Sequence, residues 1–114
     1  NIDETNSIVI DIKEAKSEIK SIGIDSFDLI KIDTEGAEYP IIKSMDINFV
    51  KKTQLIVGEL HGNHDYEFLS YLNKLGFNIR TNIKANKPHF MFYAISNKLL
   101  KSMTRKEIRV LNRL

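Results

Sequence analysis

One ten-residue segment, Leu29-Ile-Lys-Ile-Asp-Thr-Glu-Gly-Ala-Glu38, constrains the fold of this 114-residue chain more than any other feature. It begins with a short run of Leu and Ile and ends in an acidic cluster that contains a glycine. This pattern is typical of a buried parallel strand, here predicted over residues 27–33, followed by a turn. The next helix is expected to begin between Glu35 and Ala37. Pro40 then falls in the first turn, where backbone N–H groups have no partner within the helix.

A second strand is predicted over residues 53–58, and the chain between the two strands is long enough for a helical crossover. Strands joined by such a crossover pair in parallel. Before the first strand, apolar residues at helical spacing predict a helix over about residues 12–22. A capping box between Asp11 and Glu14 is expected to begin this helix, and Gly23 is expected to end it.

The most amphipathic stretch predicts a helix that Asn63 or Asp65 can cap at its start and that Gly76 ends. Two strands follow over residues 77–81 and 89–95, and the loop between them is compatible with an antiparallel hairpin. Helices and strands that alternate and then end in a hairpin favour an α/β fold, with an open sheet of parallel strands and a terminal antiparallel hairpin. Such a sheet is small, so one of its faces is expected to lack covering helices.

The net charge of +2 is unevenly distributed. Residues 98–114 carry six basic side chains and one acidic one, so the rest of the chain is net negative by three. The basic residues lie on a predicted terminal helix that begins with a capping box between Thr104 and Glu107. Charges on one terminal helix are usually a solvated face, whereas nucleic-acid-binding domains spread positive charge over a surface. We therefore expect no nucleic-acid partner.

Other patterns exclude further classes of protein. No apolar run approaches the ~18–20 residues that a membrane span needs, so no membrane partner is expected. No leader pattern marks the chain for secretion, and we expect a cytoplasmic protein. The sequence has no cysteine, which excludes disulfides, thiolate zinc sites and cysteine nucleophiles.

The ten-residue segment closely resembles the signature of FkbM-type methyltransferases, whose central strand reads approximately Leu-Ile-Lys-Ile-Asp-x-Glu-Gly-Ala-Glu. The resemblance extends from about Ile12 to Asn97. It includes a later strand that ends in an acid and a His, a helix that ends in Leu-Gly-Phe, and a final hairpin. It implies S-adenosylmethionine as the cofactor and a Rossmann-like class I sheet of seven strands, ordered 3-2-1-4-5-7-6.

The chain matches only strands four to seven of that sheet. In the family, a Gly-rich turn after strand one and an acid after strand two hold the cofactor, but this sequence contains no Gly-x-Gly. We therefore expect residues 1–97 to be the carboxyl-terminal part of a methyltransferase domain, and residues 98–114 to be a basic helix or tail. Because the chain starts at Asn1 and not at a methionine, a piece of a longer enzyme is favoured over a naturally reduced protein.

Acidic and histidine side chains gather at the predicted strand ends. Ligands of open α/β sheets bind beyond the carboxyl ends of the strands. Asp33 and Glu59 stand at two such ends, and Glu35 and His61 follow them. Adjacent strands lie ~4.8 Å apart, so these four residues can face one cleft and are the predicted catalytic residues. Asp33 and Thr34 are also expected to contact the cofactor.

Several of these residues have a structural interpretation as well. Asp33 can cap the following helix, although Thr34 can do so instead. Glu38 falls in the first turn of that helix, where a carboxylate interacts with the helix dipole, so a structural role is favoured. A loop histidine such as His61 is often only solvated. Asp33, Glu59 and His61 offer donors for a divalent cation, but a site without metal is expected.

Two functions remain open from the sequence. The first is a methyltransferase that acts on a hydroxyl of a sugar or another small metabolite, an acceptor class that comes from the resemblance. Its chemistry needs a proton removed from the hydroxyl by a histidine, a carboxylate or a metal, and the chain alone would be inactive. The second is a non-catalytic remnant or interaction module of the same fold. Because a sheet cut after its third strand exposes the edge of strand four, this chain by itself is expected to form homo-oligomers.

Overall fold

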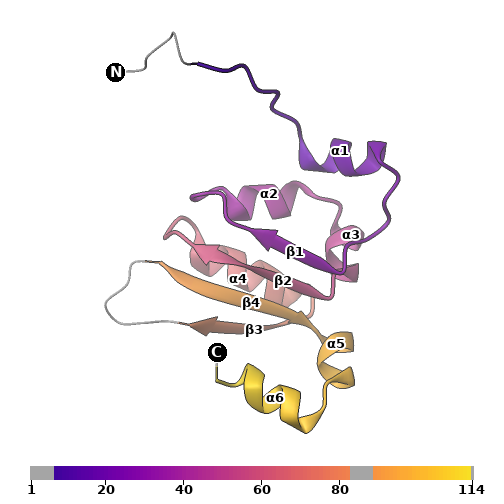
Figure 1. Ribbon diagram of the computed structural model, residues 1–114, viewed down its shortest axis with the longest axis vertical. Helices are drawn as coiled ribbons and strands as arrows, with labels where there is room; N and C mark the ends of the chain where they lie inside the picture. The colour runs from indigo at the N-terminus through magenta and orange to yellow at the C-terminus, as the bar shows by residue number, and fades with distance from the viewer. Residues whose placement is uncertain (1–6, 83–88, 114) are drawn as a thin grey trace.

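A mixed four-stranded sheet, ordered β1-β2-β4-β3, forms the centre of the computed structural model, which describes residues 7–82 and 89–113 (Figure 1). Helices α2 (Glu38–Ser44) and α3 (Ile47–Lys52) connect β1 (Leu29–Ile32) to β2 (Leu55–Leu60). The other elements are α1 (Ala15–Ser21), α4 (Asp65–Lys74), β3 (Phe77–Asn82), β4 (Phe90–Ser96), α5 (Asn97–Ser102) and α6 (Arg105–Leu111). The α/β class predicted from the sequence is confirmed.

The strands pair as the sequence predicts. β1 and β2 are parallel and are joined by the expected helical crossover. β3 and β4 form the antiparallel hairpin, and β4 also pairs antiparallel with β2. The loop predicted between β3 and β4 falls on residues 83–88, outside the described residues. Because β1 and β2 are parallel, their carboxyl ends meet at the same edge of the sheet.

One face of the sheet carries the hydrophobic core. Burial alternates along β2, where Ile56, Gly58 and Leu60 are buried. Helices α2, α3 and α4 cover this face with Ile42, Val50 and Leu72, among others. Each such side chain contributes about 1.5–3 kcal/mol when it is removed from water. The buried cluster comprises Ile32, Ile42, Met45, Phe49, Val50, Ile56, Leu60, Phe68, Leu72, Phe77, Phe92 and Ala94.

Gly58 lies where three strands approach closely. A Cβ atom at this position would lie 2.2 Å from the carbonyl oxygen of Ile32 on β1 and 2.9 Å from a ring carbon of Phe92 on β4. Only glycine leaves room for both neighbours. The close packing fixes the end of β2 against the end of β1, where the predicted site residues follow.

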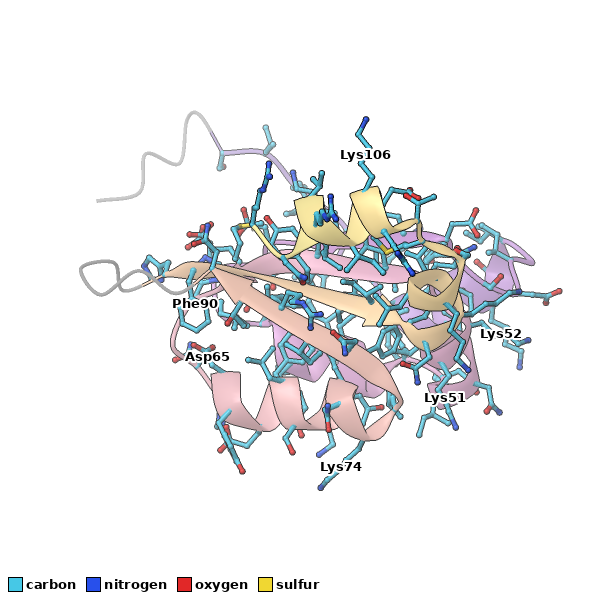
Figure 2. The ribbon with its side chains drawn as sticks, turned by 90° about the horizontal axis from the view of Figure 1, so that it is seen from below. Lys51, Lys52, Asp65, Lys74, Phe90 and Lys106 are labelled. Atoms are coloured by element: carbon cyan, nitrogen blue, oxygen red, sulfur yellow. The ribbon has the colours of Figure 1, made fainter. Side chains whose placement is uncertain are left out.

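The opposite face of the sheet is only partly covered. Figure 2 shows α6 on the other side of the sheet from α4. Leu111 of α6 and Ile95 of β4 are buried, but Leu29 at the free edge of β1 is 54% exposed. The expectation that one face lacks full helical cover is therefore confirmed at this edge.

Three predictions at the amino-terminal end are corrected by the structure. α1 begins at Ala15 and not near residue 12, and Glu14 makes no side-chain cap, so the capping box between Asp11 and Glu14 does not form. Ile12 is 94% exposed and gains no packing that would extend a short helix. β1 is an edge strand in which only Ile32 is buried, because within the described ranges it pairs on one side alone.

The turn after β1 also differs from the prediction. α2 begins at Glu38, later than the expected range from Glu35 to Ala37, because Glu35 and Gly36 have left-handed φ values of 57° and 110°. Ala37 is the N-cap residue and makes no side-chain cap, so neither Asp33 nor Thr34 caps this helix. Pro40 lies in the first turn, as predicted.

The carboxyl-terminal region forms two helices. The predicted capping box between Thr104 and Glu107 begins α6 and is confirmed. α5 was not predicted, and Ser96 caps it by accepting a hydrogen bond from the N–H of Leu99. None of the helices in the described ranges is long and apolar enough to cross a membrane.

Candidate functional site

The register of the parallel strands places the predicted site residues together. Lys31 is paired with Val57 and Ile32 with Gly58, so Asp33 follows β1 at the level of Glu59. β2 extends through Leu60, beyond the predicted end at Gly58, and Glu59 therefore lies within the strand. His61 directly follows the strand, and Glu59 and His61 present donor atoms close to each other at this end of β2.

The four predicted catalytic residues converge around the ring of His61. Its Nε2 atom lies 3.5 Å from Oδ1 of Asp33 and 3.5 Å from Oε2 of Glu35. Asp33, Glu59 and His61 each present a nitrogen or oxygen atom, and these atoms lie within 4.8 Å of one another. The side chains of Asp33 and Glu35 are 48% and 85% exposed, so the cluster opens to solvent.

His61 is not a solvated loop histidine. Its side chain is only 7% exposed, because it follows β2 directly and lies between the turn after β1 and the start of β4. The ring centroid of exposed His89 lies 5.0 Å from that of His61. No sequence pattern indicated that His89 lies near this site. Its position depends on the antiparallel pairing of β2 with β4, in which Leu60 is paired with Phe90.

Glu38 has a larger structural role in the site than we predicted from the sequence. Its carboxylate accepts hydrogen bonds from the N–H groups of Thr34, at 2.9 Å, and Gly36, at 3.1 Å. The left-handed backbone of Glu35 and Gly36 folds the turn back over the helix start and brings these N–H groups to the carboxylate. Glu38 is therefore structural, as predicted, but it holds the turn in addition to facing the helix dipole.

Glu38 also contacts the site itself. Its Oε1 atom lies 3.0 Å from Nδ1 of His61, and its side chain is only 4% exposed. Burial raises the pKa of Glu38, but the N–H groups of Glu38, Thr34 and Gly36 and the adjacent His61 together bring this pKa below its usual value. The carboxylate is thus ionised at neutral pH and lies against one side of the imidazole.

Nδ1 of His61 is buried and has no hydrogen-bond partner among the described residues. Oε1 of Glu38 lies 3.0 Å from this atom but does not form a hydrogen bond with it. A buried polar atom without a partner is rare in native proteins and requires an explanation.

Thr34, the other residue predicted to contact the cofactor, is exposed beside Asp33. Its backbone N–H already donates to Glu38 and is not available to a ligand. The arrangement as a whole offers a proton acceptor on an imidazole ring and several exposed carboxylate oxygens at the ends of two strands. Such groups can bind a hydroxyl and remove its proton, or can hold a cation.

A family model described as the methyltransferase FkbM domain matches residues 2–91 of the chain. The matched range contains β1, β2 and all the site residues described above. Searches of curated proteins and of solved structures found no match.

Proposed function

The chain belongs to the FkbM methyltransferase domain family, and from this membership we propose that it is part of an enzyme that transfers a methyl group to a hydroxyl of a sugar or another small metabolite. The family implies methyltransferase activity and, in general, S-adenosylmethionine as the methyl donor. The observation that carries the choice of a hydroxyl is the convergence of Asp33, Glu35, Glu59 and His61, since methylation of an alcohol requires a group that takes its proton.

The sheet topology supports a place in the class I methyltransferase fold. The order β1-β2-β4-β3, with parallel β1 and β2 and an antiparallel β4, is the order 4-5-7-6 that strands four to seven of that fold would have. We assign residues 1–97 to this carboxyl-terminal part. The Gly-rich turn and the ribose-binding acid of such enzymes would come from chain outside this sequence, and they would hold most of the cofactor.

Asp33 and Thr34 are proposed to contact the methyl-donating end of the cofactor. Both are exposed at the carboxyl end of β1, and their side chains are accessible there. When it is bound, S-adenosylmethionine supplies an electrophilic methyl group on a sulfonium. The residues of this chain then hold the acceptor and direct its oxygen at that carbon, and such positioning can supply about 7–11 kcal/mol of the barrier reduction.

The proton of the acceptor hydroxyl is proposed to leave to the cluster around His61. Nε2 of His61 and Oδ1 of Asp33, 3.5 Å apart, can both lie within hydrogen-bond distance of one hydroxyl. The acceptor oxygen forms its bond to the methyl carbon as the carbon–sulfur bond breaks, and the electron pair stays on sulfur. Glu38 keeps the ring in place from its buried side.

The test uses the complete protein with methyl-labelled S-adenosylmethionine and a panel of sugars and small alcohols, each paired with its deoxy analogue. We expect label in an ether product of one acceptor class and none with the matching deoxy analogue. Label found on nitrogen or carbon and not in an ether, or transfer to amines alone, would reject O-methylation. No transfer and no cofactor binding by the complete protein would favour the non-catalytic module.

A further inference from the structure

We propose that Asp33, Glu59 and His61 hold one divalent cation, best matched by Mn²⁺, at the carboxyl ends of β1 and β2. Binding of the ion requires neither methyl donor nor acceptor, and only its part in catalysis rests on the proposed function. The proposal departs from the site without metal that the sequence led us to expect.

The three donor atoms lie close to the spacing that a cation site requires. They lie within 4.8 Å of one another. Around an ion with bonds of about 2.1 Å, neighbouring ligand atoms lie about 3 Å apart and opposite ones about 4.2 Å apart. Asp33 follows the end of a strand and its side chain is 48% exposed, so a change of its rotamer can close the remaining few tenths of an ångström.

His61 supplies an independent observation that points to a ligand. Its side chain is 7% exposed and makes no hydrogen bond within the described residues. Nε2 faces Asp33 and Glu35 at 3.5 Å, which is longer than a normal hydrogen bond. Nε2 thus faces two carboxylates without a hydrogen bond to either, and a cation placed between them would complete these contacts.

Glu38 prepares the ring for this role. Metal-binding histidines usually donate their other ring N–H to a carboxylate or a carbonyl, which fixes the tautomer and the ring orientation. Oε1 of Glu38 lies 3.0 Å from Nδ1 of His61, on the side of the ring away from Asp33. A proton on Nδ1 leaves the lone pair of Nε2 free for a metal. Alignment of this pair would also satisfy the buried Nδ1 atom.

The charges around His61 also require compensation. Asp33, Glu35, Glu38 and Glu59 lie around one imidazole, and in the described parts of the chain none of them forms an ion pair with a lysine or arginine. Like charges at this spacing repel one another, and a divalent cation offsets that repulsion.

The donor types select the metal. Carboxylate oxygens suit Mg²⁺, Ca²⁺ and Mn²⁺, whereas an imidazole suits transition metals, so one nitrogen with two carboxylates favours Mn²⁺. Three protein ligands leave coordination positions open for water or for the acceptor hydroxyl. A bound hydroxyl has a lowered pKa. His61 is then a ligand, and its proposed task as the base passes to Glu35, which is 85% exposed and can release the proton to water.

The proposal is tested by titrating the full chain with Mn²⁺ and following the signal of the free ion by electron paramagnetic resonance. We expect one bound Mn²⁺ per chain, competition by excess Mg²⁺, and a pulsed-resonance nitrogen coupling from the imidazole of His61. Asp33→Asn and Glu59→Gln should each weaken binding by more than about 100-fold, beyond the range typical for loss of an outer partner. Glu67→Gln, an exposed carboxylate on α4, should leave binding unchanged.

Three results would overturn the proposal: no loss of the free-ion signal, binding without nitrogen coupling, or unchanged binding in a folded Asp33→Asn chain. The nitrogen coupling needs no variant, so the test stands even where a substitution impairs folding. Methyl transfer by the complete enzyme that persists in a chelator would reject the part of the metal in catalysis and leave the proposed function standing. Mn²⁺ binding by a complete protein that transfers no methyl group would reject the proposed function and leave the metal site standing.

Discussion

Nδ1 of His61 and Oε1 of Glu38 lie 3.0 Å apart, and both side chains are almost fully buried. His61 follows β2 directly, whereas Glu38 begins α2, the helix after β1. The pair therefore joins the ends of two neighbouring strands beneath the exposed carboxylates of the site. It ties the stability of the turn after β1 to the orientation of the imidazole.

Replacement of Glu38 by Gln is expected to lower the free energy of unfolding by about 1.5–3 kcal/mol at pH 7, because hydrogen bonds to a charged acceptor are lost. The pKa of Glu38 is lower in the folded chain than in the unfolded chain, so its ionised form stabilises the fold above the unfolded pKa. This stabilisation is lost as the pH falls through the folded pKa. Urea unfolding at several pH values should show the difference between wild type and Glu38→Gln shrinking toward acid, and a constant difference would contradict the assignment.

Gly58→Ala is expected to destabilise the sheet by about 1–3 kcal/mol, the usual cost of overpacking, or more because the clash is with backbone. The added Cβ would lie 2.2 Å from the carbonyl oxygen of Ile32. Gly62→Ala is the comparison, since a Cβ there meets nothing within 4 Å and costs only the strain of a φ of 88°. Denaturant unfolding of both variants measures the effect, and equal losses would argue against the close approach at Gly58.

The 114-residue chain alone is expected not to bind S-adenosylmethionine with useful affinity. Its sequence contains no Gly-x-Gly turn, and the N–H of Thr34 already donates to Glu38. Calorimetric titration of the chain with the cofactor should therefore give no heat of binding. Binding at micromolar concentration would show that the site is more complete than we propose.

Association through the free edge of β1 is a further expectation. Leu29 on this edge strand is 54% exposed, and unpaired strand edges and apolar surface promote pairing with other chains. Light scattering in the micromolar range, roughly where such surfaces associate, should detect a dimer or larger species. Leu29→Lys should shift it toward monomer, whereas Tyr66→Lys, at an 82% exposed position on α4, should not. A monodisperse wild-type monomer would contradict this expectation.

Much of the fold follows from short-range patterns in the sequence. The two short apolar runs predicted β1 and β2, and the length of chain between them predicted the helical crossover and the parallel pairing. Because parallel strands end at one edge of a sheet, the convergence of Asp33 and Glu59 could be predicted as well. The helix over residues 12–22 was overextended, because periodicity does not reveal whether Ile12 has anything to pack against.

The contacts of Glu38 and His89 in the site were not predicted, because they depend on backbone conformation and on strand pairing that a single sequence does not reveal. Glu38 reaches the N–H groups of the turn only because Glu35 adopts a left-handed conformation that is uncommon for this residue type. His89 meets His61 through antiparallel pairing between strands that are distant in the sequence. His61 was predicted as a catalytic residue, but the sequence left open that it is only solvated, and its 7% exposed side chain shows that it is not.

The most direct test of the proposed site is Asp33→Asn in the complete enzyme, with kcat and cofactor affinity measured separately. Asn keeps the size of Asp, and Asp33 makes no helix cap that the substitution could remove. If Asp33 orients or helps to deprotonate the acceptor, kcat should fall by about 10²–10⁴-fold while the cofactor Kd stays nearly constant. Full activity in Asp33→Asn would contradict the account.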